Sequence, residues 1–130
     1  LQEQAASAFE ILRAKVGEEY YQAFREKASQ VAPEEARLYG GRMGQFLKTM
    51  KEAMEHQWPV EGEEVQGHVQ THWEALQIVY PKTHSRHIYL AICDQLFRSP
   101  LTESDKTLAP LMDYITKATG VFAERYFSQS

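Results

Sequence analysis

Apolar side chains recur every three or four residues along most of the chain, which is the spacing of one helix face. No stretch keeps the two-residue alternation of a half-buried strand. The apolar faces comprise Met43, Phe46, Leu47, Met50 and Met54; Val65, Val69, Trp73 and Leu76 with Val79 or Tyr80; Ile88, Leu90, Ile92, Leu96 and Phe97; and Leu108, Leu111, Met112, Ile115, Thr119, Phe122 and Tyr126. We therefore predict an all-α domain of about five to seven helices joined by short loops.

Glycines and prolines mark the expected ends of these helices. The breaks are Gly17, Pro33, the pair Trp58-Pro59, Pro81 and the pair Ser99-Pro100. Pro33 suits a first helical turn, where its missing N–H costs nothing. Thr83, two residues after Pro81, is the predicted N-cap of the next helix.

The first 30 residues differ from the rest. They are rich in Gln, Glu, Lys and Ala and carry few large apolar residues in their first turns, and Gly17 divides them. We predict N-terminal helices over 1–30 and a helical ligand-binding core over 31–130. The N-terminal helices would act either as a linker from an upstream domain or as a lid that a ligand orders. Since the chain begins with Leu1 and not Met, we expect it to be a fragment of a longer protein.

Composition excludes several classes of protein. A net charge of −4 gives no overall attraction to nucleic acid. No apolar run approaches the roughly 18 residues of a membrane span, and no signal peptide is visible. The single cysteine, Cys93, cannot form an intramolecular disulfide and fits a reducing, cytoplasmic setting.

The histidines are the first candidates for chemistry. His68 and His72 are four residues apart, and His84 and His87 are three apart, so each pair can share a helix face. Such pairs can bind zinc, and one imidazole can ligate haem. Neither an H-E-x-x-H pattern nor an adjacent cysteine supports this, so structural or pocket-lining histidines are favoured. Cys93, amid apolar residues, reads as a buried thiol and not as a nucleophile.

Aromatic residues are numerous for a small acidic domain: two Trp, seven Tyr and six Phe. Most must lie in the core. Those with polar tips near predicted helix ends also suit an apolar cleft with a few polar groups, which is typical of a small-molecule site. The serines form no G-x-S-x-G motif and no phosphate-binding glycine loop is present, so we do not expect an enzyme.

Four sequence elements, in order, carry a resemblance to a known family. They are His72-Trp73; Tyr80-Pro81-Lys82-Thr83-His84-Ser85-Arg86-His87 followed by Leu90-Ala91; Ser99-Pro100-Leu101-Thr102 with Asp105-Lys106; and Pro110-Leu111-Met112-Asp113-Tyr114-Ile115. They resemble the TipAS-type, thiostrepton-binding domain found at the C-terminus of MerR-like transcription regulators. The match is good over about a third of the chain, and the upstream half agrees only in helical pattern.

The resemblance implies an open, globin-like helical fold with a ligand cleft and N-terminal helices that order on binding. It implies a bulky multi-ring ligand such as a peptide antibiotic, and activation of transcription through an N-terminal helix-turn-helix in a homodimeric full-length protein. It implies no cofactor. One departure stands out: the family's cysteine, which can add to a dehydroalanine of the ligand, is Lys82 here. Covalent capture at this position is therefore not expected.

On this basis we predict an effector-recognition domain that binds a drug-like molecule and contacts neither DNA nor membrane itself. The predicted ligand-binding residues are Trp73, Tyr80, Lys82, His84, His87 and Tyr114. Aromatic rings would stack on the ligand, Lys82 would offer a charged donor, and the histidines would hydrogen-bond it. The alternative is a haem- or metal-binding helical protein that uses His68, His72, His84 or His87. A protein-interaction domain without a small-molecule site is the third possibility.

Overall fold

The computed structural model describes residues 2–82, 85–98 and 106–127. Over these ranges the chain forms six α-helices and no strand, which confirms the predicted all-α class and helix number. The helices are α1 (Gln2–Val16), α2 (Glu18–Ser29), α3 (Pro33–Glu55), α4 (Glu63–Leu76), α5 (Arg86–Phe97) and α7 (Ala109–Tyr126), with a 3-10 turn at Lys106–Leu108 before α7. No helix of the described part is both long and apolar enough to cross a bilayer.

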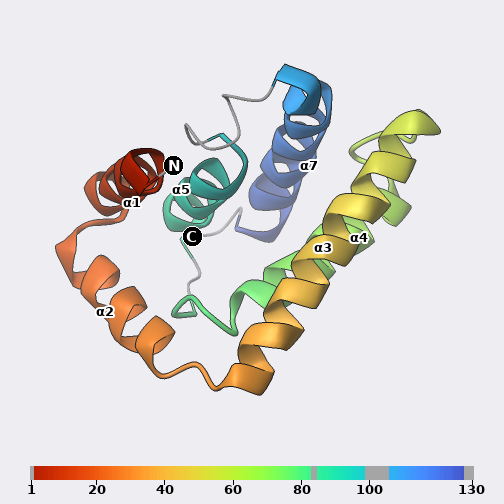
Figure 1. Ribbon diagram of the computed structural model, residues 1–130. Coiled ribbons are helices and arrows are strands. Elements are labelled where there is room, and N and C mark those ends of the chain that lie inside the picture. The colour runs from red at the N-terminus through yellow and green to blue at the C-terminus, as the bar shows by residue number, and fades with distance from the viewer. Residues whose placement is uncertain (1, 83–84, 99–105, 128–130) are drawn as a thin grey trace.

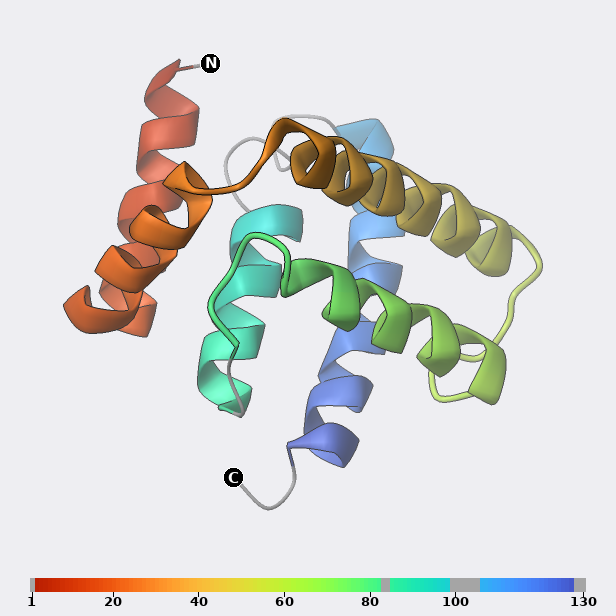
Figure 2. The ribbon, with the colours of Figure 1, turned by 90° about the horizontal axis from the view of Figure 1, so that it is seen from below.

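α3 and α4 form a long antiparallel hairpin, and α7 lies across it and against α5 (Figure 1). Viewed from below, α1 and α2 lie at one side of this arrangement, away from the α3–α4 loop (Figure 2). α7 thus has neighbours on several sides, and Ile115, Ala118 and Ala123 on it are fully buried. Burying one large aliphatic side chain contributes roughly 1.5–3 kcal/mol to stability. Because α7 buries several apolar side chains, its packing is a main contribution to the stability of the domain.

α4 shows how the sequence pattern leads to the packing. Val65, Val69, Trp73 and Leu76 recur at helical spacing, and all four are buried as predicted. Two glutamates in the first turn suit the positive end of the helix dipole. α3 runs unbroken through its three glycines because it lies in a hairpin that buries Phe46, Met50 and Ala53, and packing outweighs their low helix propensity.

α1 and α2 meet at a corner made by Gly17. Its φ of 89° lies in a region that side chains disfavour, so glycine is required there. The Arg13 guanidinium pairs with the Glu18 carboxylate across the corner, at 2.5 Å. α1 then packs along α5, while α2 turns towards the connection between α4 and α5 (Figure 1).

Several predicted helix ends were wrong by a few residues. α3 ends at Glu55, before Trp58, and α4 ends at Leu76, after which 77–80 form turns. The cap of α5 is Ser85, whose hydroxyl oxygen accepts from the Ile88 N–H at 3.3 Å, and not Thr83, which lies outside the described residues. Phe127 is buried where the apolar spacing predicted Tyr126, which is 49% exposed.

Candidate ligand-binding site

Contacts between α2 and residues 77–81 form the junction at which the N-terminal helices meet the core. The rings of Phe24 and Tyr80 stack at 4.7 Å between centroids, and both side chains are buried. The Lys27 ammonium donates to the carbonyls of Gln77, at 2.6 Å, and Tyr80, at 3.1 Å. The Tyr20 hydroxyl donates to the Pro81 carbonyl at 2.8 Å. One aromatic stack and three polar contacts therefore hold α2 on the core.

The interior side of this junction carries tyrosine hydroxyls. The Tyr80 hydroxyl donates to the Gln95 side-chain oxygen at 2.8 Å. Burial raises the pKa of Tyr39 to about 12 and that of Tyr80 well above its usual value, so both phenols stay protonated and can act as donors. Buried hydrogen-bonding groups therefore lie in the packed interior next to the junction.

α1 and α2 line an open pocket of about 470 Å³ between them. Its lining consists of Phe9, Glu10, Tyr21, Phe24, Arg25 and Ala28. Phe9 stacks on Phe24 at 6.2 Å, and Phe9 is still 38% exposed. The pocket therefore combines aromatic faces with one acidic and one basic side chain.

Exposed polar contacts hold α1 on α5. The Lys15 ammonium lies 3.1 Å from the Asp94 carboxylate, and the His87 Nε2 atom lies 2.6 Å from the Lys15 carbonyl. An exposed ion pair contributes only about 0–1 kcal/mol, because water screens it. Leu12, 1% exposed, supplies the apolar anchor of α1. Among the described side chains, α1 and α2 therefore contribute fewer buried residues each than α4, α5 or α7.

The structure brings some of the predicted site residues to this junction. Tyr80 stacks on α2, His87 contacts α1, and the exposed Lys82 follows Pro81, which α2 also contacts. His84 lies outside the described residues.

The other two predicted residues lie elsewhere. Trp73 is buried in an aromatic cluster, edge-on to Tyr89 at 5.7 Å and to Phe127 at 5.5 Å. The Tyr114 hydroxyl donates to the Trp58 carbonyl at 2.7 Å, which ties α7 to the α3–α4 loop. Both residues thus have structural contacts that account for their position.

Phe24, Lys27 and Tyr20 did not figure among the predicted site residues. A clue was available in the sequence, because Tyr20 and Phe24 are four residues apart and so share a face of α2. What this face contacts depends on the tertiary structure.

The metal alternative receives no support. Within the described ranges no group of three or more His, Cys, Asp or Glu side chains could hold a metal ion. His68 and His72 line one groove, whereas His87 contacts α1. Cys93 is buried, and desolvation raises its pKa to about 12, so it stays an unreactive thiol at neutral pH, as predicted.

Comparison with known proteins identifies the family. A model of the TipAS antibiotic-recognition domain matches residues 10–118, which is most of the chain and includes the junction, α3, α4 and α5. No curated protein and no solved structure matches the chain. The matched region runs well beyond the motifs between His72 and Ile115 from which the resemblance was drawn. This chain belongs to the family of TipAS antibiotic-recognition domains.

Proposed function

We propose that this chain is the effector-recognition domain of a MerR-like transcriptional activator, and that it binds a bulky multi-ring molecule such as a peptide antibiotic where α1 and α2 meet the core. Membership of an antibiotic-recognition family supports the ligand class. The observation that carries the site is the aromatic pocket between α1 and α2, next to the Phe24–Tyr80 stack.

The pocket has the size and surface that one ring-bearing part of such a ligand needs, and the rest of the molecule would extend beyond it. Its volume of about 470 Å³ falls within the range of roughly 300–1,000 Å³ usual for small-molecule sites. Phe9, Tyr21 and Phe24 supply ring faces, and offset stacking on each is worth about 0.5–1.5 kcal/mol beyond area burial. Glu10 and Arg25 can hydrogen-bond amides at the rim. Tyr80, Lys82 and His87 would border the bound molecule on the core side, with His84 as a further candidate.

Attachment of α1 and α2 through few buried side chains would suit a sensor. A ligand that contacts both helices and the core binds the closed arrangement better than the open one, and so shifts the population towards it. The family resemblance carries the same expectation for the N-terminal helices. The proposed regulator would transmit this shift to a helix-turn-helix outside this chain.

The remaining parts of the proposal concern partners. The domain would bind its effector without catalysis, which the protonated, buried Cys93 thiol supports. Its net charge of −4 favours no direct contact with DNA, so the helix-turn-helix would make that contact, in a homodimer and in the cytoplasm.

Calorimetric titration with thiostrepton tests the proposal. We expect the chain to bind it, and Phe9→Ala to weaken binding about tenfold, because one aromatic face of the pocket is lost. Ile11→Ala is the matched control: Ile11 lies on the same helix, is 43% exposed and does not line the pocket.

Unchanged affinity in Ile11→Ala with reduced affinity in Phe9→Ala would support the site. Equal affinities for all three proteins would place the ligand elsewhere. No binding of thiostrepton, or of other thiopeptides, to the folded chain would contradict the proposed function itself.

A further inference from the structure

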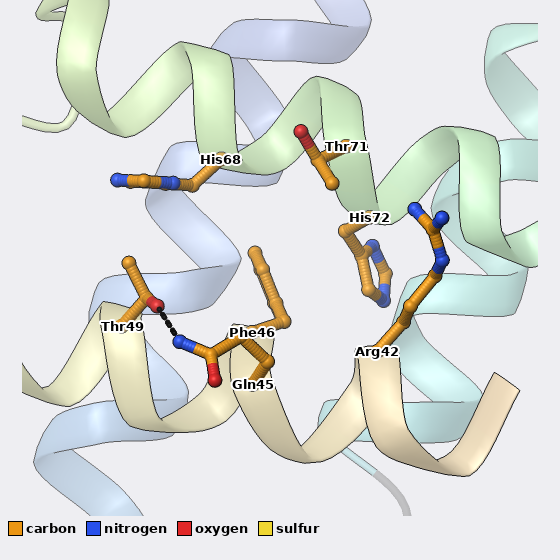
Figure 3. Close-up of a pocket in the computed structure, with 7 residues that line it drawn as sticks. All are labelled: Arg42, Gln45, Phe46, Thr49, His68, Thr71 and His72. Carbon is orange, nitrogen blue, oxygen red and sulfur yellow. Dashed lines mark hydrogen bonds between the residues drawn. The ribbon is translucent and has the colours of Figure 1, made fainter. Parts of the chain in front are cut away.

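A second groove lies between α3 and α4, and these two helices supply its lining (Figure 3). Its volume is about 190 Å³. The lining comprises Arg42, Gln45, Phe46 and Thr49 of α3 and His68, Thr71 and His72 of α4. Most of these residues carry a polar group, whereas three aromatic rings line the pocket between α1 and α2.

His72 is the unexplained residue of this groove. It is only 2% exposed, and neither Nδ1 nor Nε2 has a hydrogen-bond partner. Burial lowers its pKa to about 4, so at neutral pH the ring is uncharged, with one N–H to donate and one lone pair to accept. A buried polar group without a partner costs about 1–3 kcal/mol. Such a group in a groove points to a ligand that satisfies it.

The charges of the groove select the kind of ligand. Figure 3 shows the Arg42 side chain reaching from α3 towards α4, beside the His72 ring. Arg42 is exposed and has no ion pair or hydrogen bond with any residue that the structure describes. The lining contains no carboxylate that would attract a cation. A guanidinium without a partner pairs best with a carboxylate or phosphate, often through two hydrogen bonds.

The volume and the aromatic lining of the groove further restrict which anionic ligands fit it. A cavity of about 150 Å³ accommodates a benzene ring, so this groove has room for one ring with a small substituent, which is less than a phosphorylated sugar requires. Phe46 supplies an aromatic face in the lining and already stacks on His72 at 4.2 Å. The Thr49 hydroxyl accepts from the Gln45 amide at 3.2 Å and keeps its own proton to donate.

We propose that the α3–α4 groove binds a small ring carboxylate of about benzoate size. The carboxylate pairs with Arg42 and accepts the N–H of His72, and the ring lies beside Phe46. Arg42 turns from beside the imidazole onto the ligand, which opens the ring nitrogen, and rotamer changes of exposed side chains take only picoseconds to nanoseconds. The site is separate from the pocket of the proposed function and does not rest on it.

Nuclear magnetic resonance of the histidine rings tests this proposal, with sodium benzoate as the probe. We expect benzoate to shift the His72 ring resonances in a saturable way, and benzamide, which has the same shape without the charge, to bind at least tenfold more weakly. Arg42→Gln should weaken benzoate binding about tenfold. Lys48→Gln is the matched control, since Lys48 lies on α3 but lines a different groove.

His72→Phe provides a second variant that keeps the fold. It removes both unpartnered nitrogens, leaves a ring of similar volume, and should weaken benzoate binding about tenfold, followed through the His68 ring resonances, without lowering the melting temperature. Three results would overturn the proposal: His72 resonances that do not respond to benzoate, as expected if only water occupies the groove; equal affinity for benzoate and benzamide; or equal affinity of wild type and Arg42→Gln. Thiostrepton binding can succeed or fail independently of all three.

Discussion

Phe24 on α2 and Tyr80 after α4 stack almost parallel, with an angle of 11° between their rings. This contact joins the N-terminal helices to the core across more than fifty residues of sequence. The hydroxyl of the same Tyr80 donates to Gln95 on α5. One tyrosine thus connects α2 to the helix on which α1 packs, and the attachment of the N-terminal pair depends on it.

Replacing Phe24 should detach the N-terminal pair before the core unfolds. Phe24→Ala removes a buried ring, and such changes cost about 3–5 kcal/mol. We expect amide hydrogen exchange in α1 and α2 to accelerate strongly, while the amides of α4 and α7 keep their protection. Phe24→Leu should have a smaller effect. Equal acceleration in every helix would show that α1 and α2 do not open separately from the core.

Gly17 should be intolerant of a side chain. Its φ of 89° and ψ of 159° lie in a region that is essentially restricted to glycine. Gly17→Ala should therefore lower the free energy of unfolding by about 1–3 kcal/mol, measured by urea denaturation. Gly44→Ala is the control, because Gly44 is exposed within α3 and a Cβ there meets no atom within 4 Å. Gly44→Ala should stabilise the protein by about 0.5–1 kcal/mol. A similar decrease in the free energy of unfolding in both variants would contradict a special requirement for glycine at position 17.

His72 should make stability depend on pH. Its pKa is about 4 in the folded chain, against 6.5 when unfolded, so the unfolded state binds the proton more readily. Protonation of His72 therefore costs no stability well above pH 6.5. As the pH falls from 6.5 to 4, it lowers the free energy of unfolding by about 3 kcal/mol at most. His72→Phe should remove this part of the acid loss. If the free energy of unfolding falls by the same amount from pH 7 to pH 4.5 in wild type and in His72→Phe, His72 does not cause the acid loss.

Much of the fold follows from the sequence, because the apolar spacing of α4 and α7 is regular and strong. Boundaries were less predictable: Pro81 cannot continue a helix, but α4 had already ended at Leu76. The sites depend on tertiary packing. Arg42 and His72 belong to different helices, and only the hairpin brings them into one groove. The spacing of His68 and His72 predicted that they share a helix face. It gave no information about Arg42, which lies across the groove on α3.

Lys82 offers a test of where the ligand lies relative to the loop before α5. In the family pattern a cysteine stands at this position, and Lys82 is exposed. Lys82→Cys should add its thiolate to a dehydroalanine of thiostrepton: a carbon–sulfur bond forms, the neighbouring carbon takes up a proton, and the mass equals the sum of both molecules. Wild type should form no adduct, since the buried Cys93 thiol has a pKa of about 12. Thiostrepton binding without an adduct would place the loop away from the ligand.

Hydrogen exchange of the chain with and without thiostrepton tests the central claim most directly. If the effector binds where α1 and α2 meet the core, saturating thiostrepton should slow exchange across 9–29 and 77–82, while α7 changes little because it is already protected. Protection confined to α3, α4 or α7, or unchanged exchange in α1 and α2 at saturation, would contradict the assignment of the effector site.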